Sequence, residues 1–77
     1  MIVKPFGKIV DVLQQDIVPE NKYQNWMELQ KHLFERFPEL KNEHYLVAIN
    51  HKIISEKENP DLQSGDEIAL LPPFSGG

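Results

Sequence analysis

The chain has 77 residues, of which 40% are hydrophobic and 26% are charged, and its net charge is −4. This length allows one domain with a thin core, because such a domain buries about 60 to 65% of the surface that its unfolded chain exposes. The acidic balance argues against nucleic acid as a partner, since phosphate contacts need a basic stripe, and the absence of cysteine excludes disulfides, thiolate zinc sites and thiol nucleophiles.

The chain begins with MIVKPFGK, which lacks the hydrophobic run of a signal peptide or a membrane span, so we expect a cytoplasmic protein without a membrane partner. Residues 1–6 are apolar and β-prone, and they predict a first strand. Pro5 cannot donate a hydrogen bond, so the strand should be irregular there or should turn that position away from its neighbour. Gly7 then permits a turn.

The next segment, KIVDVLQQDIV at residues 8–18, is ambiguous. Its apolar residues at positions 9, 10, 12 and 13 fit a short helical turn, whereas alternation through Asp11 and Leu13 to Ile17 and Val18 fits the second strand of a hairpin. We favour a second strand that ends before Pro19.

A helix is indicated more clearly in the middle of the chain. Asn25 is a good N-cap, and Glu28 stands where the acid of a capping box belongs. Apolar residues then recur at helical spacing until Pro38 forbids continuation; they are Trp26, Leu29, Leu33, Phe34 and Phe37. This apolar stripe should face a sheet.

The second half of the chain predicts three strands separated by turns. They are a buried strand at 45–49 (YLVAI), a short return strand at 52–55 and a last strand at 67–71 (EIALL). Two hairpin-like ends with one helix between them indicate an α+β fold, in which one mixed sheet packs on one main helix.

The side chains offer no assembled catalytic or metal site. His32, His44 and His51 lack metal-ligand spacing, and Asp66 and Glu67 are strand neighbours whose side chains point to opposite faces. No serine lies in a nucleophile motif, and no glycine-rich loop precedes a helix to hold phosphate.

The C-terminal tail, residues 72–77 (PPFSGG), is the distinctive part of the sequence. Pro72 and Pro73 favour polyproline geometry, so the tail can project roughly 18 to 20 Å from the sheet. Gly77 has no Cβ, which leaves its carboxylate open to attack from either side. Being partly rigid, such a tail would lose less entropy on entering a deep pocket than a flexible one.

Two stretches, LVAINHKIIS and LQSGDEIALLPPFSGG, resemble the family of small, sulfur-carrying subunits of molybdopterin synthase. The resemblance extends more weakly to MIVKPFG and to ELQKHLFERFPEL. It implies a ubiquitin-like β-grasp domain at residues 1–71, followed by an extended tail at 72–77.

The same resemblance implies a function for the tail. A ubiquitin-activating-type adenylyltransferase would use ATP to adenylate the Gly77 carboxylate, which would then become a thiocarboxylate, with no cofactor bound by the chain itself. The tail would enter the large subunit of a heterotetrameric synthase and give its sulfur to cyclic pyranopterin monophosphate; the inserted residues would be Pro72, Pro73, Phe74, Ser75 and Gly76.

By the same analogy, Phe6, Leu71 and Phe74 are candidates for an apolar docking surface, although Phe6 and Leu71 fit the core of the sheet equally well. Two other Gly-Gly classes remain open: sulfur carriers of the thiamine pathway and protein modifiers, both of which generally lack the Pro-Pro pair. A third alternative is a β-grasp interaction module without terminal chemistry. The pair Leu70–Leu71, where the family often has Phe-Phe, leaves the details of the docking surface open.

Overall fold

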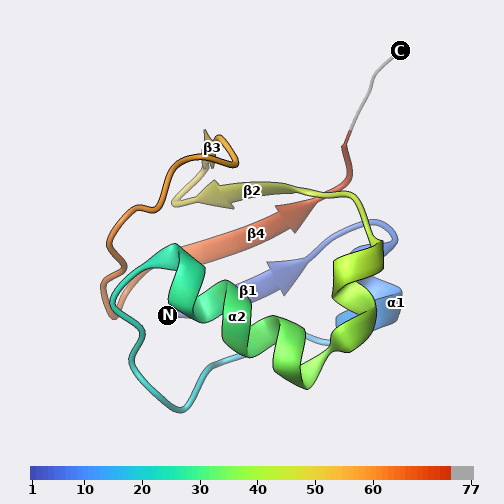
Figure 1. Ribbon diagram of the computed structural model, residues 1–77, viewed down its shortest axis with the longest axis horizontal. Helices are drawn as coiled ribbons and strands as arrows, with labels where there is room; N and C mark the ends of the chain where they lie inside the picture. Colours follow the sequence, from blue (N-terminus) through green and yellow to red (C-terminus); the bar gives the residue numbers. More distant parts are fainter. Residues whose placement is uncertain (74–77) are drawn as a thin grey trace.

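The computed structural model describes residues 1–73 (Figure 1). Over this range the chain forms β1 (Ile2–Pro5), α1 (Ile9–Leu13), α2 (Trp26–Arg36), the 3₁₀ helix η1 (Pro38–Asn42), β2 (Leu46–Ile49), β3 (Lys52–Ile54) and β4 (Glu67–Leu71). The strands make one sheet in the order β1-β4-β2-β3. β4 is parallel to β1 and antiparallel to β2, so the sheet is mixed, as the sequence predicts.

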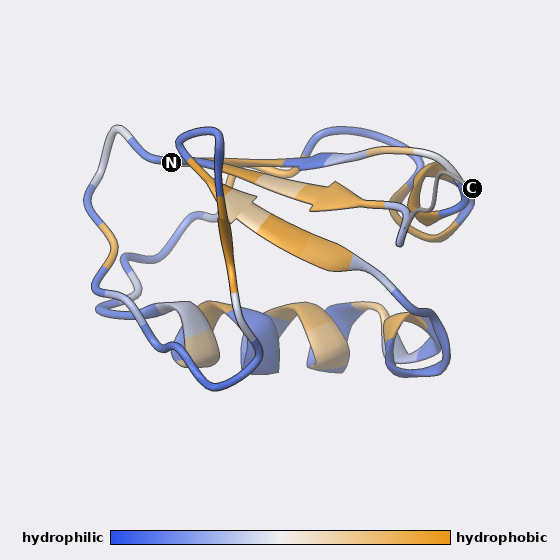
Figure 2. Ribbon diagram, turned by 90° about the horizontal axis from the view of Figure 1, so that it is seen from above, coloured by the Kyte–Doolittle hydropathy of each residue, from blue (hydrophilic) through white to orange (hydrophobic). Residues whose placement is uncertain are grey.

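One face of the sheet is covered and carries the core. Figure 2 shows α2 running along that face. Because side chains alternate along a strand, Ile68 and Leu70 of β4 point toward α2 and are fully buried, whereas Glu67, Ala69 and Leu71 lie on the other face. The residues of the core are Val3, Ile9, Leu13, Ile17, Trp26, Leu29, Leu33, Leu40, Val47, Leu62, Ile68 and Leu70.

The main helix begins and ends where the sequence predicts. The Glu28 backbone N–H donates to Oδ1 of Asn25 at 3.0 Å, so Asn25 is the N-cap. Its backbone is extended there, as an N-cap requires. At the other end, Phe37 is the C-cap and Pro38 starts η1 instead of continuing α2. The capped helix therefore holds its apolar stripe against the sheet, although Phe34 and Phe37 are only partly buried.

The second strand expected before Pro19 is wrong. Residues 9–13 form α1, and beyond it Ile17 makes only a single bridge with Val3. The helix is favoured because Ile9 and Leu13, one turn apart, lie on the same side and are both buried. Gln14 then ends α1 with a left-handed backbone (φ 69°).

Pro5 lies within β1 without breaking its pairing. The backbone N–H groups of Ile2 and Phe6 donate to the chain that forms β4, whereas that of Val3 donates to the Ile17 carbonyl at 2.8 Å. Position 5 points the same way as position 3, away from β4. Pro5 thus occupies the side where no ladder donor is needed, which confirms the second of the two arrangements that the sequence allows.

A side-chain clamp joins the β2–β3 turn to the start of β4. Asn50 and His51 both have positive φ (52° and 70°), as a tight type I′ hairpin turn requires. The Asn50 side chain accepts from the Glu67 backbone N–H at 3.0 Å and donates to Oδ1 of Asp66 at 2.8 Å. Asp66 in turn accepts from the Gln63 backbone N–H at 2.7 Å, so the clamp fixes where β4 begins.

We expect Asn50→Ala to lower the free energy of unfolding by about 1 to 3 kcal/mol. The substitution removes both side-chain hydrogen bonds and a residue type that tolerates positive φ. Urea denaturation measures the change, with Asn21→Ala at an exposed position as a control that should stay within about 0.5 kcal/mol of the parent. Equal stability of the two variants would show that the clamp does not contribute.

Candidate functional site

The face of the sheet that points away from α2 carries an outer apolar patch. Strand pairing sets Leu46 opposite Leu71, Ala48 opposite Ala69, and Ile53 opposite Ala48, and directly paired residues share a face. Phe6 continues the alternation of β1 onto the same face, beside Leu71. We define the patch as Phe6, Leu46, Ala48, Ile53, Ala69 and Leu71.

The large members of this patch are open to solvent. Phe6 is 43% exposed, Leu46 39% and Ile53 57%, while Leu71 is half-buried. A contiguous set of exposed apolar side chains is typical of a surface that binds another protein. Phe6 is therefore a surface residue, and its alternative placement in the sheet core is wrong.

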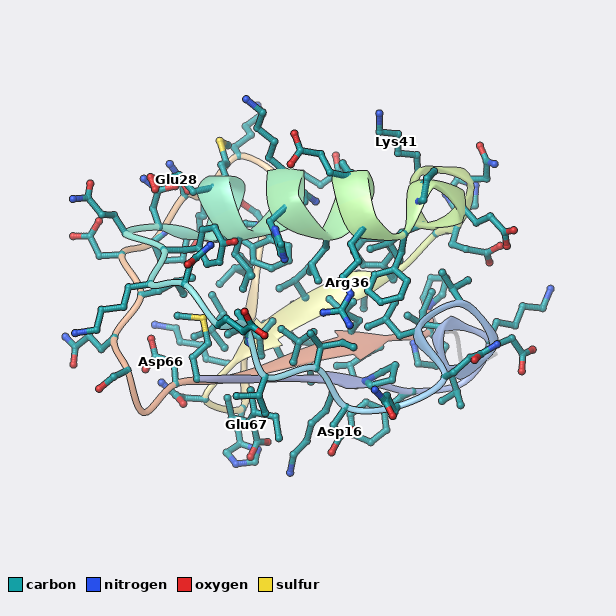
Figure 3. All side chains as sticks on the ribbon, turned by 90° about the horizontal axis from the view of Figure 1, so that it is seen from below. Asp16, Glu28, Arg36, Lys41, Asp66 and Glu67 are labelled. Atoms are coloured by element: carbon teal, nitrogen blue, oxygen red, sulfur yellow. The ribbon has the colours of Figure 1, made fainter. Side chains whose placement is uncertain are left out.

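The opposite end of the same face is polar. Lys4 Nζ lies 3.4 Å from Oε1 of Glu67, and His51 Nε2 lies 3.9 Å from its Oε2. Figure 3 shows the Glu67 side chain on the side of the sheet away from α2. The outer face thus changes from charged at the start of β4 to apolar at its end, where the chain leaves the sheet.

The tail begins directly beside the apolar end. β4 ends at Leu71, where the chain leaves the sheet (Figure 1). Pro72 and Pro73 follow as exposed residues. Just before this point the Phe6 N–H donates to the Leu70 carbonyl at 3.0 Å, which ties the end of β1 to the end of β4. Four predicted site residues, Phe74, Ser75, Gly76 and Gly77, lie outside the described residues.

The patch contains two residues that the sequence reasoning missed, Leu46 and Ile53. The sequence predicts that the strand YLVAI is buried, but only Val47 and Ile49 share the inward face with Leu70 and Ile68. Period-two alternation was the available signal. It could not be used, because the partner strands and their register decide which half of a short apolar run faces outward.

Two of the titratable residues singled out in the sequence have local structural contacts. The His32 ring packs at a tilt against Tyr23 with centroids 5.2 Å apart, and Asp66 belongs to the Asn50 clamp. Within residues 1–73 no three His, Cys, Asp or Glu side chains gather as a metal site would need. The same residues contain no helix that is long and apolar enough to cross a membrane.

A groove of about 620 Å³ lies between α2, η1 and β2, and Trp26, Phe34 and Tyr45 contribute to its lining. It borders the patch and the tail, because Leu46 and Pro73 also line it. The Gln30 side-chain amide donates to the Tyr45 hydroxyl at 3.3 Å. Burial raises the pKa of Tyr45, and the hydrogen bond from Gln30 opposes part of that shift. Tyr45 therefore stays neutral well above physiological pH.

A mixed four-stranded sheet packed on one main helix, with an apolar outer face beside the end of β4, defines the class: a ubiquitin-like β-grasp domain. The ThiS family model matches residues 3–77, and the chain belongs to the ThiS family.

Two similar proteins show which members of the family this chain resembles. The chain is 31% identical over 80 residues to a molybdopterin synthase sulfur carrier subunit of Dictyostelium discoideum, covering 94% of this chain and 90% of that protein. It also matches a chain in the complex of subunits 1 and 2 of the molybdopterin-converting factor from Helicobacter pylori, with a TM-score of 0.71 and 27% identity over 99% of this chain and 96% of that one. The resemblance stated from the sequence is confirmed.

Proposed function

We propose that this chain is the sulfur-carrier subunit of a molybdopterin synthase. The observation that carries the proposal is the outer apolar patch, which runs into the Pro72–Pro73 start of the tail on a β-grasp fold. The similar proteins from Dictyostelium and Helicobacter support it, because one is a sulfur carrier subunit of this synthase and the other comes from a two-subunit complex.

The reactive group is the carboxylate of Gly77. A free carboxylate is a poor electrophile, so a ubiquitin-activating-type adenylyltransferase joins it to the α-phosphate of ATP and releases pyrophosphate. A sulfur nucleophile then attacks the acyl carbon and displaces AMP, which leaves a thiocarboxylate. In the synthase, this sulfur passes to cyclic pyranopterin monophosphate, and water restores the carboxylate. The chain itself binds no cofactor in this scheme.

The folded part and the tail have different tasks. Residues 1–71 form the β-grasp domain and dock through Phe6, Leu71 and the rest of the outer apolar patch, while residues 72–77 are the tail. Pro72 to Gly76 enter a pocket of the large subunit, and Phe74 adds an apolar contact at its entrance. The complex is a cytoplasmic heterotetramer, in which the chain supplies sulfur and the large subunit supplies the catalytic side chains.

Mass spectrometry tests the proposal directly. The protein is incubated with an activating enzyme of this class, ATP and a sulfur donor, and its C-terminal peptide is analysed. We expect the mass change of one sulfur in place of one oxygen, located at Gly77 and dependent on ATP. A tail that is adenylated but instead joins lysine side chains of other proteins would identify a protein modifier and overturn the proposal.

A further inference from the structure

Gly7, which follows β1, lies against Pro72 at the base of the tail. Its φ is +58°, and an ideal Cβ on it would lie 3.1 Å from Cγ of Pro72, 3.4 Å from its Cβ and 3.5 Å from its Cδ. The Pro72 ring therefore packs directly on the Gly7 main chain. A distance of 3.1 Å from a Cβ to a neighbouring atom is shorter than nine in ten such contacts in proteins, so a methyl group on Gly7 would crowd the Pro72 ring.

Strand register creates this contact. β1 and β4 run parallel with Pro5 paired to Leu70, so two steps further along both chains Gly7 comes opposite Pro72. Since Pro72 has no N–H, the ladder cannot continue there by hydrogen bonding. Packing of the proline ring on glycine takes over from the backbone ladder at the point where the tail leaves the sheet.

The other side of Gly7 is fixed by the start of α1. The Val10 N–H donates to the Gly7 carbonyl at 3.2 Å, and the Ile9 N–H donates to the Phe6 carbonyl at 3.1 Å. Ile9 is buried in the core, which anchors this turn. Pro72, in contrast, is exposed, so any crowding between the two is relieved by movement of the tail and not of the turn.

We propose that Gly7 is a positioning residue: its bare, left-handed backbone seats the Pro72 ring and sets the direction in which the tail leaves the sheet. The inference rests on the proposed function, because direction matters only if the tail has to reach a fixed target while the outer apolar patch is docked. Phe6 and Leu71 hold the patch to the partner, and Gly7 with Pro72 aligns the tail relative to it.

The expected effect follows from the geometry. To relieve the crowding, the Pro72 ring must move away from position 7 by a few tenths of an ångström, which tilts an extended tail by about 5° in the bound state. Because the tail extends by about 3.1 Å per residue, this tilt displaces its end by about 1 Å. A misplacement of that size lowers reaction rates by about tenfold to a hundredfold, even though the docking surface is unchanged.

The test uses the variants Gly7→Ala, Pro72→Ala and the double variant, with Gly65→Ala as a control, because an added Cβ at Gly65 meets no atom within 4 Å. In the free protein, NMR should show a nuclear Overhauser effect between the Gly7 Hα and Pro72 ring protons, and Gly7→Ala should weaken the corresponding effect.

The kinetic test uses the same variants. With the activating enzyme, Gly7→Ala should lower kcat for thiocarboxylation about tenfold or more, with KM changed less than about threefold. Gly65→Ala should match the parent.

The double variant separates positioning from stability. Alanine at a positive φ costs about 1 kcal/mol or more whatever residue stands at position 72. If Gly7 acts through Pro72, adding Gly7→Ala to Pro72→Ala causes no further loss of kcat. An equal loss on both backgrounds, or a Gly7→Ala variant with the kcat of the parent, overturns the inference. Failure of the parent protein itself to be thiocarboxylated would instead overturn the proposed function.

Discussion

A variant that lacks Gly77 is expected to support no measurable molybdopterin formation while keeping its fold. The deletion moves the terminal carboxylate back by one residue, about 3.1 Å in an extended tail. Since a displacement of about 1 Å at a reacting group can cost about a hundredfold in rate, a displacement three times larger removes the activity. The readout is product formation by the synthase reconstituted with its large subunit and a thiocarboxylation system.

The fold provides the control for this deletion. β4 ends at Leu71 and the core residues all lie at or before Leu70, so the free energy of unfolding should change by less than about 0.5 kcal/mol. A preparation whose terminal carboxylate is converted to an amide gives a second check, because all 77 residues remain. If either form sustains product formation at the rate of the parent, the reactive group is not the Gly77 carboxylate.

Phe6→Ala is expected to weaken binding to the large subunit by about thirtyfold or more. Exposed aromatic side chains that become buried at the centre of an interface contribute about 2 kcal/mol or more, and Phe6 is the one aromatic member of the outer apolar patch. Its 43% exposure means that the fold depends little on it. Isothermal titration calorimetry of the two subunits measures the change in Kd.

Val18→Ala is the matched control for Phe6→Ala. Val18 is 65% exposed and lines a hollow with His32 and Arg36, to which no residue of the patch contributes. Its substitution should change Kd by less than about threefold. Equal affinities for the Phe6 variant, the Val18 variant and the parent would show that the partner does not dock on the outer face.

The main helix and the last strand followed from local rules. Asn25 caps α2 and Pro38 ends it because these residues act on backbone groups within a few positions of themselves. β4 coincides with its predicted bounds, since a turn at residues 64–66 precedes it and Pro72 ends its ladder. The prediction of a strand in segment 8–18 was wrong because the apolar pattern there fits both a helical and a strand period. The short helix α1 forms because it buries both Ile9 and Leu13 in the core.

The candidate site divides in the same way. Gly77, Pro72 and Pro73 could be proposed from the sequence, because their chemistry depends on residue type and position along the chain. Phe6 and Leu71 came from a resemblance that left their burial undecided. Leu46 and Ile53 could be assigned to the patch only from the register of β2 with β3 and β4. The contact of Gly7 with Pro72 could be found only from the parallel pairing of β1 with β4.

By itself, the sequence determined the layer architecture and the chemistry proposed for the tail. Periodicity, caps and prolines act over a few residues, and a missing Cβ is a property of glycine alone. Only the tertiary structure decided which apolar residues face outward and what lies at the base of the tail. Both depend on the register between strands: β2 with β3 and β4 for the outward-facing residues, and β1 with β4 for the base of the tail. A shift of one residue in such a register exchanges the two faces of a strand.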